Sequence, residues 1–253
     1  MEGRLTLSSS LLTVAMQHRV GAVSLDVNFA LTQPWTVLFG PSGSGKTTVL
    51  RAIAGFVRPD AGRIEFATEV FFDSSARVFV PAHRRAVRTA GQMARLFPHM
   101  NVMSNIIFGS GWNSKPHDAR DIAEQVMESL HLNDLRNRMP RDLSGGERQR
   151  TAVARALVSA ITFNFNRTER PLLLLDEPLS GLDVGTRDEM VIELKQWTAR
   201  WKIPVLSVTH DLGEAFQLEA EVVKIADGRV VKQGPVDEVL TEERSRLLKQ
   251  LGG

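Results

Sequence analysis

The sequence predicts an α/β fold with a mostly parallel sheet, an N-terminal antiparallel β subdomain and an inserted helical subdomain. Three observations support this prediction. The first ninety residues are rich in strand patterns, the middle of the chain has helical periodicity, and the last third alternates strands with helices. Such alternation is typical of a parallel sheet that is covered by helices.

The N-terminal part contains short strand patterns separated by turns. We interpret Leu5–Met16 as a strand pair and not as a signal peptide, because hydroxyl side chains interrupt its apolar residues and no small-residue cleavage site follows. Apolar and polar residues alternate in Ala22–Leu31, as in a half-buried strand. Trp35–Phe39 is a short apolar strand, and Gly45–Ala54 is expected to be a helix that ends at Gly55. Further strands are expected at Arg63–Phe66, Val70–Phe72 and Arg77–Val80.

The middle of the chain is expected to be helical. Apolar residues recur at spacings of three and four between Ala119 and Leu130, and Ser144–Ile161 has the pattern of a second helix. Asp227-Gly228 is a hairpin signal between two short strands. The last third is expected to contain strands at Pro171–Asp176, Ile203–Thr209, Val222–Ile225 and Val230–Lys232, and helices at Asp183–Trp201, Asp211–Leu218 and Val236–Leu251.

We expect one domain over residues 1–253. Its nucleotide-binding core would comprise residues 1–92 and 162–253, and its helical subdomain about residues 93–161. No C-terminal regulatory domain is expected.

The composition excludes several classes of protein. Hydrophobic residues make up 43% and charged residues 24% of the 253 residues, which is typical of a globular chain. The absence of cysteine excludes disulfides, zinc-thiolate sites and thiol catalysis. A net charge of +2, from 31 basic and 29 acidic residues, gives no nucleic-acid footprint, so we expect no nucleic-acid partner. Because no apolar run is long enough to span a bilayer, we expect a cytoplasmic protein whose membrane role is peripheral.

The strongest motif is a Gly-rich loop that fits the pattern G-x-x-x-x-G-K-[ST] between an apolar strand and a helix. Glycines let successive backbone N–H groups curl around phosphate oxygens, and the helix N-terminus adds partial positive charge. Lys46 would reach the β- and γ-phosphates, and the Thr47 hydroxyl would ligate Mg²⁺. The predicted nucleotide-binding residues of this loop are Gly40, Pro41, Ser42, Gly43, Ser44, Gly45, Lys46, Thr47 and Thr48.

The second motif is a pair of carboxylates after an apolar strand. Leu172–Leu175 leads directly into Asp176 and Glu177. Ligands bind at the carboxyl ends of strands in open α/β sheets, so Asp176 could hold Mg²⁺ and Glu177 could polarise an attacking water. Taken alone, the same residues would also fit a buried strand followed by a solvated turn.

The third motif is a second helix start that can bind an anion. Ser144, Gly145 and Gly146 precede a helical pattern, and free N–H groups at a helix start attract anions. The alternative is a simple capping box, in which Ser144 pairs with Glu147 three positions later.

Together these motifs resemble the ATP-binding cassette family. The residues Leu143–Arg150, LSGGERQR, lie between the phosphate loop and LLLLDEP, as the family signature does. The resemblance also assigns Gln92 to the Q-loop, Ser180–Asp183 to the D-loop and His210 to the switch histidine, and it covers essentially the whole chain. It implies a P-loop nucleoside triphosphatase core of the RecA-like type, with ATP and Mg²⁺ as cofactors.

A finer resemblance is to the ATP-binding subunits of molybdate importers. It is carried by Asp73–Pro81, by His83–Arg85 and by Ala94–His99, although Leu96–Met100 also resembles importers of sugars, polyamines and sulfate. The chain departs from the family pattern at Gly91, where an aromatic residue is usual.

Two further departures from the family pattern concern the residue that stacks on adenine and the length of one link between elements. The chain contains no Tyr to stack on adenine, and His18 is offered as a substitute. The link Ile161–Arg170 is several residues longer than in the family.

The resemblance implies a mechanism. Two chains would sandwich ATP, so that the phosphate loop of one and Ser144–Gly146 of the other grip one γ-phosphate. Thr47, Asp176 and Gln92 would hold Mg²⁺ or its waters. Glu177 would orient the attacking water. The remaining roles are that Lys46 neutralises phosphoryl charge, that His210 contacts the γ-phosphate, and that Asp183 lies at the subunit contact.

The implied partners are transmembrane permease subunits and, through them, a solute-binding protein, with the chain at the cytoplasmic face of the inner membrane. The expected function is ATP hydrolysis that powers import of molybdate or a related oxyanion. Importers of sulfate, polyamine, sugar or iron remain alternatives, as does a non-transport cassette ATPase. A plain P-loop kinase or GTPase would lack the Ser144 motif and His210, and Glu177 argues against an adaptor that binds ATP without hydrolysis.

Overall fold

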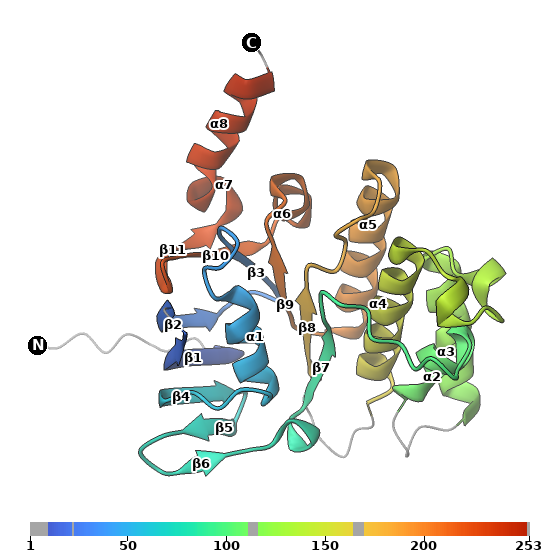
Figure 1. Ribbon diagram of the computed structural model, residues 1–253, viewed down its shortest axis with the longest axis horizontal. Coiled ribbons are helices and arrows are strands. Elements are labelled where there is room, and N and C mark those ends of the chain that lie inside the picture. The colour runs from blue at the N-terminus through green and yellow to red at the C-terminus, as the bar shows by residue number, and fades with distance from the viewer. Residues whose placement is uncertain (1–9, 22, 111–115, 164–169, 252–253) are drawn as a thin grey trace, which may run out of the picture.

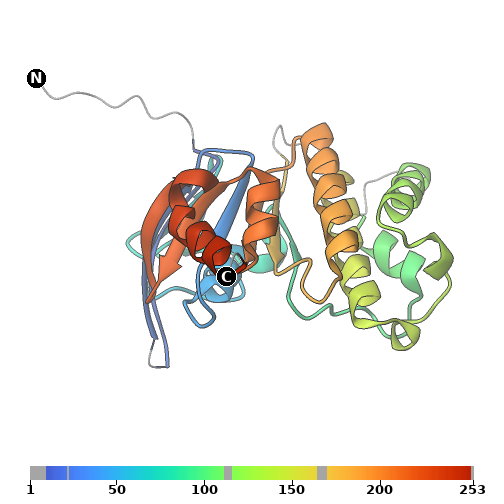
Figure 2. The same ribbon diagram turned by 90° about the horizontal axis from the view of Figure 1, so that it is seen from above.

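One sheet joins a parallel part to an antiparallel part. The computed structural model describes residues 10–21, 23–110, 116–163 and 170–251. Its eleven described strands follow the order β6-β5-β4-β1-β2-β11-β10-β3-β9-β8-β7 (Figure 1). The antiparallel strands lie at one end of the molecule and the helices α2 and α3 lie at the other, which Figure 2 shows from above.

The parallel part consists of β3 (Trp35–Phe39), β7 (Val87–Ala90), β8 (Leu172–Asp176), β9 (Val205–Thr209) and β10 (Glu221–Ala226). Every residue of β3, β8 and β9 is buried. Helices and the antiparallel strands cover both faces, which explains the nearly continuous apolar runs in the sequence. Since these strands are parallel, the segments that follow them converge at one edge of the sheet.

The antiparallel part consists of β1 (Leu12–Val20), β2 (Val23–Leu31), β4 (Ala61–Phe66), β5 (Glu69–Asp73) and β6 (Val78–Phe79). Buried and exposed residues alternate along β2 from its third residue, because one face of the hairpin packs on the core and the other meets solvent. The strand β11 (Arg229–Pro235) returns from β10 through a tight turn. Asp227 and Gly228 both have positive φ there, as the hairpin prediction requires.

Two hydrophobic clusters lie on opposite faces of the parallel strands. Leu172 and Leu174 of β8 pack in the cluster that contains α1 and the antiparallel strands, whereas Leu173 and Leu175 pack with the longer helices. The described helices are α1 (Lys46–Ala54), α2 (Val102–Phe108), α3 (Pro116–Ser129), α4 (Gly145–Ile161), α5 (Val184–Trp201), α6 (Leu212–Leu218), α7 (Val236–Val239) and α8 (Thr241–Leu251), with short 3₁₀ turns at Ala82–Arg84, Asn133–Leu135 and Pro140–Asp142.

Most predicted elements are confirmed, with three differences. The strand β7 and the helix α2 were not foreseen. The single C-terminal helix is wrong in detail, because buried Leu240 leaves helical geometry and separates α7 from α8. Residues 5–9 of the predicted strand pair and 164–169 of the long link lie outside the described residues. Among the helices that are described, none is long and apolar enough to cross a lipid bilayer.

Arg85 ties the end of α1 to the antiparallel part of the sheet. Its side chain is buried, and Nη1 donates to the carbonyl oxygens of Ala52 and Ile53 at 2.7 and 2.6 Å. Nε and Nη2 donate to the carbonyls of Val80 and Phe71 at 2.7 and 3.2 Å. Burial lowers the pKa of Arg85 to about 10, so the group stays charged at neutral pH. The charge therefore caps the negative end of the α1 dipole.

We predict that Arg85→Met lowers the free energy of unfolding by roughly 3 kcal/mol, because it leaves buried carbonyls without donors. Urea denaturation would measure this change. Arg84→Met is the matched control, since the neighbouring Arg84 side chain is exposed and should change stability by less than about 0.5 kcal/mol. Equal midpoints for the two variants would show that Arg85 is not an anchor.

Candidate functional site

The phosphate loop connects β3 to α1 at the carboxyl edge of the sheet. Gly45 has a φ of 100°, and a Cβ there would approach Leu25 Cδ2 to 2.2 Å. A Cβ at Gly40 would lie 2.1 Å from the carbonyl oxygen of Ile225 in β10. Both positions therefore require glycine. The loop packs directly on Leu25 of β2 and on the backbone of β10.

Lys46 and Ser44 give this loop the groups that an anion needs. Lys46 is buried, and its Nζ donates to the carbonyl oxygens of Gly40 and Pro41 at 2.8 Å each. Burial lowers the pKa of Lys46, against the opposing effect of Glu177 and Asp176. The buried Ser44 Oγ has no hydrogen-bond partner among the described residues. An unpaired hydroxyl, an ammonium group and the N-terminus of α1 together suit a phosphate chain.

The Thr47 hydroxyl and the Asp176 carboxylate lie side by side next to the loop. Thr47 Oγ1 donates to Asp176 Oδ1 at 3.2 Å. Burial raises the pKa of Asp176, and the bond from Thr47 opposes this effect. Hydroxyl and carboxylate oxygens are the donors that Mg²⁺ prefers, so this pair fits a magnesium ion.

The carboxylate of Glu177 is hydrogen-bonded to two side chains from other segments. His210 Nδ1 lies 3.1 Å from Glu177 Oε1, and Gln92 Nε2 donates to Oε2 at 3.1 Å. His210 follows β9 and Gln92 follows β7, so the parallel topology brings them together. Gln92 contacts Glu177 here and not the Thr47–Asp176 pair. The structure thus places Lys46, Thr47, Gln92, Asp176, Glu177 and His210 along one edge of the sheet.

The start of α4 has the capping-box geometry. Ser144 Oγ accepts from the backbone N–H of Glu147 at 3.2 Å, and Glu147 Oε2 accepts from the N–H of Ser144 at 2.6 Å. Gly145 and Gly146 border a hollow of about 400 Å³ that Gln92 and Ser180 also line. Residues of the phosphate loop do not line this hollow, so the two helix starts face different spaces within one chain.

Asp183 and His18 lie apart from this cluster. Asp183 is the exposed N-cap of α5, and its Oδ1 accepts from the N–H of Thr186 at 3.0 Å. His18 Nδ1 lies 3.4 Å from Asp60 Oδ2 in a hollow of about 870 Å³ beside β1 and β2. The stacking role of His18 stays a prediction.

Sequence reasoning missed two buried polar residues near Glu177. Gln149 Nε2 donates to the carbonyl oxygen of Glu177 at 3.3 Å. Glu214 Oε2 accepts from Thr209 Oγ1 at 2.9 Å, and Thr209 Oγ1 accepts from the N–H of Asp211 at 3.0 Å. The Thr209–Glu214 pair therefore braces the backbone on both sides of His210. In the sequence, Gln149 and Glu214 each look like an ordinary surface residue of a helix. The only available signal was that each occupies a helical position where an apolar residue is expected.

Glu214 is a buried carboxyl at the back of the site. Together with Glu177, Leu182 and His210 it lines a hollow of about 130 Å³. Burial raises the pKa of Glu214 to about 7, the bond from Thr209 lowers it and the charge of Asp211 raises it. Electrostatic interactions with Arg187 and His210 lower this pKa and so oppose the effect of burial.

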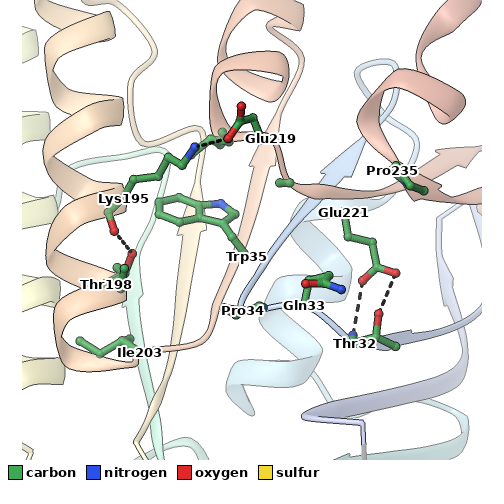
Figure 3. A pocket seen from close by; sticks show the side chains of 13 residues that line it. Thr32, Gln33, Pro34, Trp35, Lys195, Thr198, Ile203, Glu219, Glu221 and Pro235 are labelled. Carbon is green, nitrogen blue, oxygen red and sulfur yellow. Dashed lines mark hydrogen bonds and ion pairs between the residues drawn. The ribbon is translucent and has the colours of Figure 1, made fainter. Parts of the chain in front are cut away.

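A separate cavity of about 560 Å³ lies at the opposite edge of the sheet, by the amino ends of β3, β9 and β10. Trp35 lines it, Lys195 pairs with Glu219 at 3.1 Å and Glu221 bonds to Thr32 (Figure 3). Lys195 and Glu219 pair with each other, the Glu221 carboxylate accepts hydrogen bonds from Thr32, Thr36 and Gln233, and no predicted site residue lines the cavity. The cavity is therefore not part of the phosphate site.

Comparisons with known proteins identify related sequences. The family profile described as ABC transporter matches residues 24–180. The chain is 40% identical to the molybdenum import ATP-binding protein ModC of Mesorhizobium japonicum, over 90% of this chain and 59% of that protein. It is 42% identical to ModC of Methylococcus capsulatus, over 85% of this chain and 57% of that protein. The chain spans about three fifths of the length of these relatives.

Solved structures share the fold. CbiO1 from Clostridium perfringens, described as part of the ABC transporter complex cbiONQ, aligns with a TM-score of 0.74 and 24% identity over 96% of both chains. The cassette MJ0796, solved as a dimer in a post-hydrolysis state with ADP and Pi, aligns with a TM-score of 0.71 and 23% identity over 89% of this chain and 98% of that one. These similarities confirm the predicted fold class.

We predict that Glu214→Gln stabilises the protein more at pH 8 than at pH 5. The folded pKa is raised above the ordinary value of 4.5, so wild-type stability falls as the pH rises from about 4.5 to about 7 and stays lower above that. The difference between the two pKa values corresponds to roughly 3 kcal/mol, which the neutral amide would avoid. Urea unfolding at both pH values measures the effect. Glu242→Gln removes one charge from a side chain that is 76% exposed and is the control; the same gain at both pH values for Glu214→Gln would contradict the prediction.

Proposed function

Because the chain belongs to the ABC transporter family, we propose that it is the ATP-hydrolysing subunit of an importer for molybdate or a related oxyanion. One observation carries the proposal. The phosphate loop, the Thr47–Asp176 pair and the bonded set of Gln92, Glu177 and His210 occupy the same edge of the sheet.

In the proposed reaction, ATP is the substrate and the loop holds its phosphates. Lys46 would exchange the carbonyls of Gly40 and Pro41 for β- and γ-phosphate oxygens. Glu177 would orient a water whose oxygen bonds to the γ-phosphorus while the bond from that phosphorus to the β,γ-bridging oxygen breaks, giving ADP and phosphate. His210, already bonded to Glu177, would hold the carboxylate in line and contact the γ-phosphate.

The oxygens of Thr47, Asp176 and Gln92 would hold Mg²⁺ or its waters, and Gln92 would leave its present bond to Glu177 to do so. When bound, the ion would neutralise charge on the phosphate oxygens. Thr47 keeps its hydroxyl directed at Asp176 by the 3.2 Å bond, so the pair is already arranged for a shared ligand.

The second anion-binding helix start calls for a second chain. Gly145 and Gly146 border a hollow that no residue of the phosphate loop of the same chain lines. A two-fold dimer would bring this tip onto ATP held by the partner, with Asp183 near the contact. Two equivalent sites would then close together around two ATP molecules.

Permease subunits would occupy the surface by Gln92 and the helices α2 and α3, with a solute-binding protein on their far side. The chain would then lie at the cytoplasmic face of the inner membrane as a peripheral subunit. Closure of the dimer would reorient the permease. Molybdate as solute follows from the names of the relatives, whose full length this chain does not span.

We predict that Glu177→Gln retains ATP binding and lowers ATP turnover by about 10²-fold or more, because the amide cannot polarise water. Phosphate release and equilibrium ATP binding would be measured on the same preparations. The matched control is Glu219→Gln, because Glu219 lines the cavity at the opposite edge of the sheet. This variant should keep wild-type turnover.

The Glu177→Gln variant should also form a dimer in Mg²⁺ and ATP, because it holds the nucleotide without consuming it. Light scattering with and without ATP would show the change in mass. Wild-type turnover in this variant would remove Glu177 from its role, and a monomer saturated with ATP would exclude the sandwich.

We predict that the chain copurifies in detergent with the molybdate permease of the same organism, and that its ATPase rate rises several-fold with molybdate-loaded binding protein. Sulfate-loaded binding protein is the comparison. If only the sulfate-loaded binding protein raised the ATPase rate, the solute would be reassigned. If the chain copurified with no permease and its ATPase rate did not change when permease was added, transport would be excluded.

A further inference from the structure

Gln149 connects the helix behind the Ser144 tip to the peptide that carries Glu177. It lies on the first turns of α4 and is buried, with 4% of its surface exposed. Its Nε2 donates to the carbonyl oxygen of Glu177 at 3.3 Å. A buried amide is costly unless its polar atoms are paired, so this contact fixes the side chain as well as the peptide.

The peptide at Glu177 is in a conformation that needs support. Glu177 has a φ of 48°, which is uncommon for a residue with a side chain. Its N–H donates to the carbonyl of Val208 at 3.0 Å, and its carbonyl accepts from Ser180 N–H and Oγ at 3.2 and 3.0 Å. Strained backbone persists only where its surroundings hold it. Gln149 supplies a further hydrogen bond to this carbonyl, and that bond comes from the helix α4 and not from the turn itself.

A second contact joins the same two segments. A Cβ at Gly146 would lie 2.7 Å from Leu182 Cδ2, so the start of α4 packs closely on the turn that follows Glu177. Leu182 is held in that turn by its N–H to the carbonyl of Leu179 at 3.4 Å. The first two turns of α4 therefore touch the Glu177 turn through both an apolar and a polar contact.

We propose that Gln149 is a positioning residue for Glu177. By fixing the carbonyl of Glu177 it sets the direction in which the carboxylate leaves the backbone, and it makes the Glu177 turn and the start of α4 a single unit. The proposal rests on the role of Glu177 in the proposed function. Gln149 itself touches no reacting atom.

The test replaces Gln149 with leucine, which has a similar size and no donor. We expect Gln149→Leu to lower kcat about tenfold and to leave the affinity for ATP unchanged. Gln217→Leu is the matched control, because Gln217 Nε2 also donates to a backbone carbonyl, that of Asp188 at 3.1 Å, but away from the site. The control should keep wild-type kcat. If Gln149→Leu folds poorly, Gln149→Met retains an unbranched side chain and replaces it.

A double variant separates positioning from a general structural role. Since Gln149 acts through the Glu177 carboxylate, Gln149→Leu should cause no further loss of turnover in a Glu177→Gln background. An additional tenfold loss there, or wild-type kcat in Gln149→Leu alone, would overturn the inference. If Glu177→Gln itself keeps wild-type turnover, the proposed function has failed and not the contact described here.

Discussion

The site depends on one constraint, the parallel arrangement of four neighbouring strands. Because β3, β7, β8 and β9 run in the same direction, the residues that follow each strand meet at one edge. The carboxylate of Glu177 is therefore reached by Gln92 from one neighbour and by His210 from the other. No local sequence could create this set, because each member comes from a different strand end. If the strands lost their register, all of these contacts would be lost together.

The antiparallel strands serve the same site from the other side. They pack with α1 against the parallel strands, and Leu25 of β2 leaves no room for a side chain at Gly45. On the parallel side, the carbonyl of Ile225 in β10 does the same at Gly40. Arg85 closes the far end of α1 by joining two of its carbonyls to β5 and to the end of β6. The phosphate loop is thus fixed at one end by steric contact and at the other by a buried charge.

The sequence predicts the local parts of this structure and misses its cross-contacts. The phosphate loop and the α4 start could be predicted because a few adjacent residues decide their backbone geometry. The strand β7 could not, since only Val87 and Ala90 of its four residues are buried and they leave no clear period. Gln149 and Glu214 bond to carbonyl and hydroxyl groups that are 28 and five residues away, so their role appears only when the chain has folded. Leu240 is fully buried and its backbone leaves helical geometry, so it separates α7 from α8.

The capping box and an anion site at Ser144 are compatible uses of one geometry. Ser144 Oγ is engaged by the N–H of Glu147, and Glu147 in turn satisfies the N–H of Ser144. The N–H groups of Gly145 and Gly146 stand in the first turn, where a helix offers no acceptor. A cap of this kind fixes their direction without occupying them. The hydroxyl thus orients the tip, and the backbone of the two glycines is the part that would bind a phosphate under the proposed function. Through Gln149 the same helix start is bonded to the peptide of Glu177.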